Sequence, residues 1–135
     1  MKQKPIIVKT EHVIDMDMLN DVIVSAIEGG SNYWYFIAEE AYKTIKKYQK
    51  DGKCFSESIL PAILAGEKID IHDLEEQDEV IGTISLETLQ ERLQKMADDC
   101  RPEISIIYQY SDDDYDANDA DVIFQYLCMG EIVFG

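Results

Sequence analysis

The residues best suited to chemistry form one string of eight, Glu28-Gly29-Gly30-Ser31-Asn32-Tyr33-Trp34-Tyr35. Glycines let a ligand approach the backbone, free N–H groups at a helix start attract negative charge, and aromatic faces stack on planar bases. This 28–35 junction therefore suits an anionic or nucleotide-like ligand. Its spacing also fits a plain corner, in which a glycine closes one helix, Ser31 or Asn32 caps the next, and Trp34 enters the core.

The acidic run of residues 112–119 is a second candidate, because aspartates alternate there as in a calcium-binding EF-hand loop. The sixth position of that frame is Ala117, where a glycine makes the turn. The twelfth is Ile123, where a glutamate binds calcium through both oxygens. The run therefore predicts a solvated loop and a helix cap, and we expect no metal and no cofactor.

Motifs for nucleophilic or zinc chemistry are missing from the sequence. The two histidines, His12 and His72, lie far apart and outside any recognised pairing with a serine or a cysteine. The three cysteines are scattered without Cys-x-x-Cys spacing, so neither a disulfide framework nor a zinc site is expected. No apolar run approaches the length of a membrane span or of a signal peptide. We expect a reducing, cytoplasmic setting and no contact with a membrane.

The formal charge of −16 is concentrated in the second part of the chain. Residues 1–60 hold 8 lysines against 9 acidic residues, whereas residues 61–135 hold 4 basic residues against 19 acidic ones. Such a charge repels nucleic acid and anionic lipid, so direct nucleic-acid binding is not expected. It favours either solubility or a basic partner surface.

The first half of the chain predicts two helices that meet at the glycine pair. Residues 5–8 are β-prone and predict a first strand. Asp15 or Asp17 caps a helix that ends at the glycines, one of which takes the left-handed conformation. The serine or asparagine that follows caps a second helix, with Trp34 on its apolar face, which runs to about residue 51.

The middle of the chain predicts a short helix, a hairpin and an amphipathic helix. The short helix starts near Pro61, and residues 69–72 and 80–84 form an antiparallel pair with a long acidic loop. Ser85 then caps a helix with leucines on one stripe. The apolar run of residues 104–110 is too short to separate strand from helix by its period.

The C-terminal part predicts a last helix, capped by Asp116 or Asn118 and closed by Gly130, and then a strand of residues 132–134. No repeat or linker divides the sequence. We therefore predict one compact α+β domain over residues 1–135, with about four helices packed on a small, mainly antiparallel sheet. The apolar tail around Phe134 is compatible with a homo-oligomer formed by strand addition.

Three segments together resemble a group of small, uncharacterised tailed-phage and prophage proteins. They are the 28–35 junction, the run from Tyr115 to Val122, and the ending Gly130-Glu131-Ile132-Val133-Phe134-Gly135. The stretch from Val80 to Asp98 looks similar too, and residues 38–78 match least. The resemblance implies a phage or mobile-element origin, hence a host cytoplasm, and supplies no catalytic residue.

Three functions from different classes follow. The first is a non-catalytic phage accessory protein that binds a small nucleotide-like ligand, such as a host defence signal, at the 28–35 junction, with Asp116 and Asp119 beside it. The second is an acidic inhibitor that imitates DNA and occupies a basic host protein. The third is a nucleotide-processing enzyme that uses the C-terminal carboxylates. Binding is favoured over catalysis.

Overall fold

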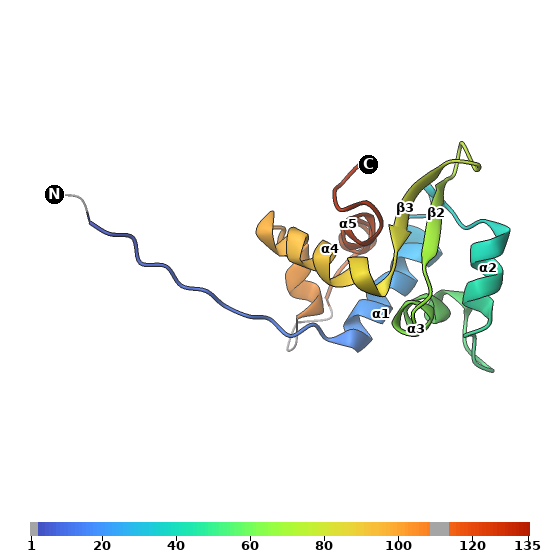
Figure 1. The fold of residues 1–135 in the computed structure, drawn as a ribbon, viewed down its shortest axis with the longest axis horizontal. Helices are drawn as coiled ribbons and strands as arrows, with labels where there is room; N and C mark the ends of the chain where they lie inside the picture. Colours follow the sequence, from blue (N-terminus) through green and yellow to red (C-terminus); the bar gives the residue numbers. More distant parts are fainter. Residues whose placement is uncertain (1–2, 109–113) are drawn as a thin grey trace.

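The computed structural model describes residues 3–108 and 114–135. It forms an α+β fold whose elements follow one another along the chain in this order: α1 (Met16–Ser25), a π-helical turn η1 (Ala26–Gly30), β1 (Tyr35–Phe36), α2 (Glu39–Lys46), a 3₁₀ turn η2 (Phe55–Ser58), α3 (Ile59–Leu64), β2 (Ile69–Asp73), β3 (Val80–Ile84), α4 (Leu86–Asp98), a 3₁₀ helix η3 (Pro102–Ile107) and α5 (Ala117–Met129). In Figure 1, α4 and α5 lie on one side of the β2–β3 hairpin and α2 lies on the other. Within the described ranges, no helix is long and apolar enough to cross a membrane.

The sheet is antiparallel, with strand order β1-β2-β3. Ile69 pairs with Ile84 at one end of the hairpin, and the register shifts after Ile71. The predicted hairpin is therefore confirmed. β1 adds only two residues, and Tyr35 pairs there with Asp73.

α5 is the central helix of the fold and contacts β3, η1, α1, α4 and η3. Eight of its residues are buried, which is most of its circumference. An α-helix that is buried nearly all round needs few charges on any side. Two of the eight buried residues are nevertheless polar, Asp121 and Gln125.

Side-chain caps fix three helix starts as the sequence predicts. The carboxylate of Asp15 accepts the backbone N–H of Asp17 at the start of α1, Ser85 accepts that of Thr88 in α4, and Asp116 accepts that of Asp119 in α5. Gly130 closes α5 with φ of 77°, in the left-handed region that glycine favours. The short helix near Pro61 is α3.

The second predicted helix is wrong at its start, where neither Ser31 nor Asn32 caps it, and it ends at Lys46, before residue 51. Residues 31–34 form a turn, residues 35–36 are β1, and α2 begins only at Glu39. The cause is pairing with a distant strand: the carbonyl of Trp34 accepts the N–H of Leu74 at 2.9 Å, next to the β1–β2 ladder. Trp34 therefore lies outside α2, although its spacing predicted that it belongs to that helix.

Three other predicted elements also differ. Gly29 and Gly30 are not left-handed, because they lie in the π-helical turn that the Ser31 N–H closes on the Ala26 carbonyl. Residues 5–8 and 132–134 are not strands. The undecided run of residues 104–110 is 3₁₀ helix as far as Ile107, and its last two residues lie outside the described part.

Candidate functional site

The 28–35 junction surrounds a buried carboxylate on α5. Asp121 is 7% exposed. Its Oδ1 accepts the Ser31 hydroxyl at 2.7 Å and the Trp34 indole N–H at 2.8 Å. Its Oδ2 accepts the Tyr33 hydroxyl at 2.6 Å and the Gln125 amide N–H at 3.1 Å. These five residues, called the Asp121 network below, join two segments almost ninety positions apart in the chain.

Neutral donors alone satisfy this carboxylate, since none of the four is a lysine or an arginine. A buried carboxylate is costly unless hydrogen bonds replace its water, and bonds to a charged acceptor are stronger than neutral ones. Burial, together with the hydrogen bond to Asp121, raises the pKa of Tyr33 to about 12. The Tyr33 hydroxyl is thus held in its protonated, donating form.

Gln125 extends the network to the C-terminal tail. Its Oε1 accepts the backbone N–H groups of Val133 and Phe134 at 2.8 and 2.9 Å, and its Nε2 donates to the Phe134 carbonyl at 3.1 Å. The side-chain amide thus supplies the partners that a neighbouring strand would supply. This is the physical reason why residues 132–134 need no strand.

The ring of Trp34 is enclosed by other aromatic rings. Phe134 stacks on it at 5.3 Å with an interplanar angle of 9°, and Phe124 and Tyr35 approach at 5.7 and 6.2 Å. Trp34 is 2% exposed. In this arrangement the indole offers no free face on which a planar base can stack. Tyr35 is tied as well, because its hydroxyl donates to the Ile27 carbonyl at 2.7 Å.

The two glycines of the junction have different surroundings. A Cβ on Gly30 would lie 2.6 Å from the backbone oxygen of Ala117, so only glycine lets the start of α5 approach η1 this closely. A Cβ on Gly29 would meet nothing within 4 Å. Gly30 is therefore a packing residue, whereas Gly29 faces open space.

An acidic cleft of about 460 Å³ lies between α1, η1 and the start of α5, lined by Asp21, Ser25, Glu28, Gly29, Tyr115, Asp116 and Ala117. The lining contains three carboxylic acids and no lysine or arginine. The Tyr115 hydroxyl donates to Asp21 at 2.6 Å, and Glu28 accepts the Ser56 hydroxyl at 2.9 Å. Each of these two acids retains further acceptor sites, since a carboxylate has about four.

The residues singled out in the sequence thus divide into separate groups. Ser31, Tyr33 and Trp34 belong to the Asp121 network, whereas Glu28, Gly29 and Asp116 line the acidic cleft. Asp119 reaches back to the N–H of Asp116 at 3.1 Å and completes the cap of α5. Asn32 is exposed.

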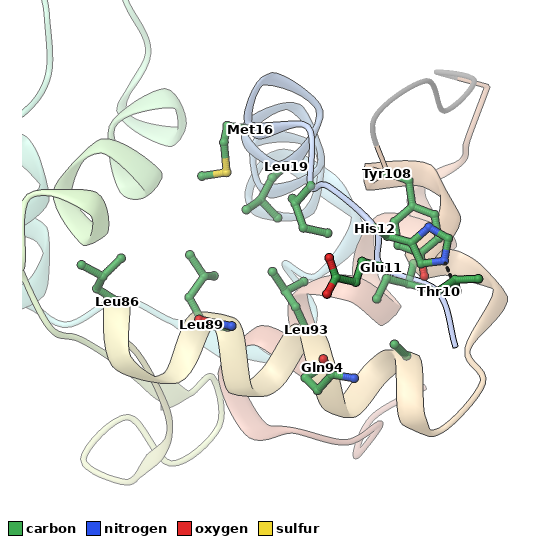
Figure 2. A pocket seen from close by; sticks show the side chains of 14 residues that line it. Thr10, Glu11, His12, Met16, Leu19, Leu86, Leu89, Leu93, Gln94 and Tyr108 are labelled. Carbon is green, nitrogen blue, oxygen red and sulfur yellow. Dashed lines mark hydrogen bonds between the residues drawn. The ribbon is translucent and has the colours of Figure 1, made fainter. Parts of the chain in front are cut away.

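Sequence reasoning missed a second hollow, which is lined mainly by apolar side chains. This apolar groove of about 650 Å³ lies between α1, α4 and the chain around residues 10–14, and it is lined by Thr10, Glu11, His12, Ile14, Met16, Leu19, Leu86, Leu89, Gln90, Leu93, Gln94, Ala97, Ile104 and Tyr108 (Figure 2). Leu86 and Met16 are 51% and 41% exposed. The sequence placed Leu86 on the buried stripe of α4, which is wrong, because Leu86 lies at the open edge of this groove.

Other reactive groups give no second centre. In the described ranges, no three histidine, cysteine or acidic side chains gather as metal ligands. Burial raises the pKa of the Cys128 thiol well above its usual value, which keeps it protonated and unreactive. Cys54 and Cys100 are exposed free thiols. No family model, curated protein or solved structure matches the chain.

Proposed function

We infer that this protein is a non-catalytic binding protein whose acidic cleft receives basic side chains of a partner protein. The observation that carries the proposal is the cleft lining, in which Asp21, Glu28 and Asp116 meet without a lysine or an arginine. A hollow lined by carboxylates attracts ammonium and guanidinium groups and repels phosphate. Gly29 adds open backbone at the same place.

The charge around the cleft supports a cationic partner. Only five ion pairs occur among the described residues, and none of them includes a residue of the cleft lining. With 28 acidic residues against 12 basic ones, most carboxylates are left without a basic side chain. The resulting field steers basic surfaces toward the protein and weakens as salt is added.

A nucleotide-like ligand at the 28–35 junction has less support from the geometry. The hydroxyls of Ser31 and Tyr33 and the indole N–H already donate to Asp121, so a ligand would have to replace those bonds. Its phosphates would also approach the three acids of the cleft. Of the functions that the sequence leaves open, we therefore propose the acidic inhibitor of a basic host protein over the nucleotide-binding protein.

Catalysis by the C-terminal carboxylates has less support for a similar reason. Asp116 and Asp119 each accept the other's backbone N–H in the cap of α5, and Asp121 accepts four bonds in its network. General acid–base work needs a carboxylate within reach of a substrate proton. We therefore propose a binding role without turnover, in a phage-encoded setting that the sequence resemblance implies.

The test is calorimetric binding of octalysine, a defined basic peptide, to the wild type and to two charge-matched variants. The cleft variant Asp21→Asn/Glu28→Gln/Asp116→Asn keeps hydrogen-bonding groups, and asparagine still caps a helix. The control variant Glu75→Gln/Glu76→Gln/Asp78→Asn removes the same charge from the exposed β2–β3 loop.

We expect the cleft variant to bind octalysine about tenfold more weakly than the control variant, since three ion pairs worth about 0.5 kcal/mol each are lost at one place. Affinity for the wild type should fall as salt rises. Equal weakening in both variants would contradict the cleft as the site, because net charge alone would then explain binding.

A further inference from the structure

The chain before α1 is an apolar arm that leaves the body of the protein (Figure 1). The arm is defined here as residues 3–9, and it is exposed along its whole length. Ile6, Ile7 and Val8 are 92%, 76% and 79% exposed. Three adjacent β-branched residues with this much exposure gain stability when a surface covers them.

The base of the arm is fixed to the body beside the apolar groove. His12 stacks on Tyr108 at 3.8 Å with an interplanar angle of 2°. Ile14 forms an isolated antiparallel β-bridge with Tyr108, and the N–H of Asp15 donates to the Ile107 carbonyl at 2.8 Å. Figure 2 shows His12 and Tyr108 at one end of the groove and Leu86 at the other. The arm therefore starts where the groove ends.

The arm cannot easily turn back into its own groove. Residues 6–13 contain no glycine, proline, asparagine or aspartate, which are the residues that form tight turns. β-branched side chains favour the extended backbone instead. A segment that is stiff, extended and anchored at one end reaches a second molecule more readily than its own body.

The charge distribution also favours a second molecule as the one that receives the arm. Residues 1–10 contain three lysines and no acid, whereas residues 11–135 contain 9 basic and 28 acidic residues. The groove lining itself contains one acid, Glu11, and no lysine or arginine. A basic apolar arm is thus complementary to an acidic body with an apolar groove, and both belong to the same chain.

The spacing of the apolar side chains in the arm also matches the row of leucines on α4. Leu86, Leu89 and Leu93 lie along one side of α4, and the helix rises about 10 Å over the seven steps from Leu86 to Leu93. An extended arm rises about 3.3 Å per residue and turns alternate side chains to the same side. Ile6 and Val8 therefore point to one side, about 7 Å apart, and match two positions along this leucine row.

We propose that this chain forms a homodimer by exchange of arms, in which Ile6 and Val8 of each copy insert into the apolar groove of the other. Reciprocal exchange gives a two-fold symmetric dimer and closes the assembly, because both grooves and both arms are then used. Ile7 faces away from the groove. This inference is independent of the acidic cleft.

Sedimentation velocity of the full chain over a range of concentrations tests the proposal. The arm variant Ile6→Asp/Val8→Asp and the groove variant Met16→Asp/Leu86→Asp change only exposed side chains, so the monomer is expected to fold. Each should weaken dimerisation at least tenfold, whereas Ile7→Asp should weaken it much less. A wild type that stays monomeric, or a dimer that both variants leave intact, would overturn the proposal.

Crosslinking identifies the molecule that supplies the arm. In a Cys54→Ser/Cys100→Ser background, one chain carries Val8→Cys and a second chain, of different mass, carries Leu86→Cys. Mild oxidation of the mixture should yield a disulfide between the two chains. A single chain that carries both cysteines and closes the disulfide only within itself at low concentration would show self-docking and overturn arm exchange.

Discussion

The Asp121 network and the N-terminal arm differ in how far contacts within the chain satisfy their side chains. In the network, every polar group of the Asp121 carboxylate has a partner, and Trp34 is covered on its faces by other rings. In the arm, three adjacent apolar side chains are each more than three-quarters exposed. The region with the more distinctive sequence is thus internally complete, whereas the plainer region has unsatisfied binding surface.

The comparison teaches where to look for function in this chain. An unusual mixture of glycine, hydroxyl, amide and aromatic residues is needed to bury a carboxylate without a cation, so rarity of a motif can follow from folding alone. Incomplete burial and unbalanced charge are the better guides here, and they point to the acidic cleft and to the arm with its groove.

The largest expected effect is that of Asp121→Ala. It leaves buried donors of Ser31 and Trp34 without an acceptor, each worth about 1–3 kcal/mol, so the free energy of unfolding should fall by about 3–5 kcal/mol. Asp119→Ala on the same helix removes only a capping contact and should cost about 1 kcal/mol or less. Urea unfolding measures both, and equal losses would refute the central place of Asp121.

The two glycines of the junction should respond in opposite directions. Gly30→Ala forces a Cβ toward the Ala117 oxygen and should cost about 1–3 kcal/mol, as overpacking does. Gly29→Ala meets open space and should be neutral or stabilising by up to about 1 kcal/mol. Thermal unfolding of both variants checks this, and a matching loss in Gly29→Ala would show that the two positions are equally packed.

The prediction of the fold from sequence succeeded where local signals decide the structure. The caps at Asp15, Ser85 and Asp116, the hairpin and the left-handed Gly130 all follow from a few neighbouring residues. The prediction of a helix over residues 31–36 was wrong because β1 forms only through pairing with residues 72–73, far along the chain. No local period reports such a contact.

The candidate site was only partly visible in the sequence. The sequence singled out residues 28–35 and Asp116, but it missed Gln125 in the network and Asp21 in the cleft. The division between buried network and open cleft depends on which side chains α5 turns inward. Asp121 and Gln125 lie four positions apart in residues 120–129 of α5, which contain no other charged or amide side chain, and this spacing places both on one face. A polar pair on a buried helix was the signal that would have identified the network.

A smaller effect is expected from alkaline pH through Tyr33. Its pKa is raised from 10.0 to about 12 in the folded chain, so between those pH values the folded state holds a proton that the unfolded state has lost. Stability from this group is complete below pH 10.0 and decreases toward pH 12. Tyr33→Phe should flatten this part of the stability profile measured by urea unfolding, and an unchanged slope would contradict the raised pKa of Tyr33.

The smallest effect on stability is expected in the arm. At concentrations at which the chain is monomeric, Ile6→Asp/Val8→Asp should change the free energy of unfolding by less than about 0.5 kcal/mol, because neither side chain is buried. Chemical denaturation at two chain concentrations separates this from dimer stability. A loss at both concentrations would show that the arm folds onto its own body.

The most direct test of the central claim is a double-mutant cycle between Tyr33→Phe and Asp121→Ala, read as free energies of unfolding. If the 28–35 junction serves to hold this carboxylate, the two losses should be coupled by about 1 kcal/mol or more, as in a shared hydrogen-bond network. Additive losses, within about 0.3 kcal/mol, would contradict this role of the junction and would again favour its interpretation as a ligand-binding site.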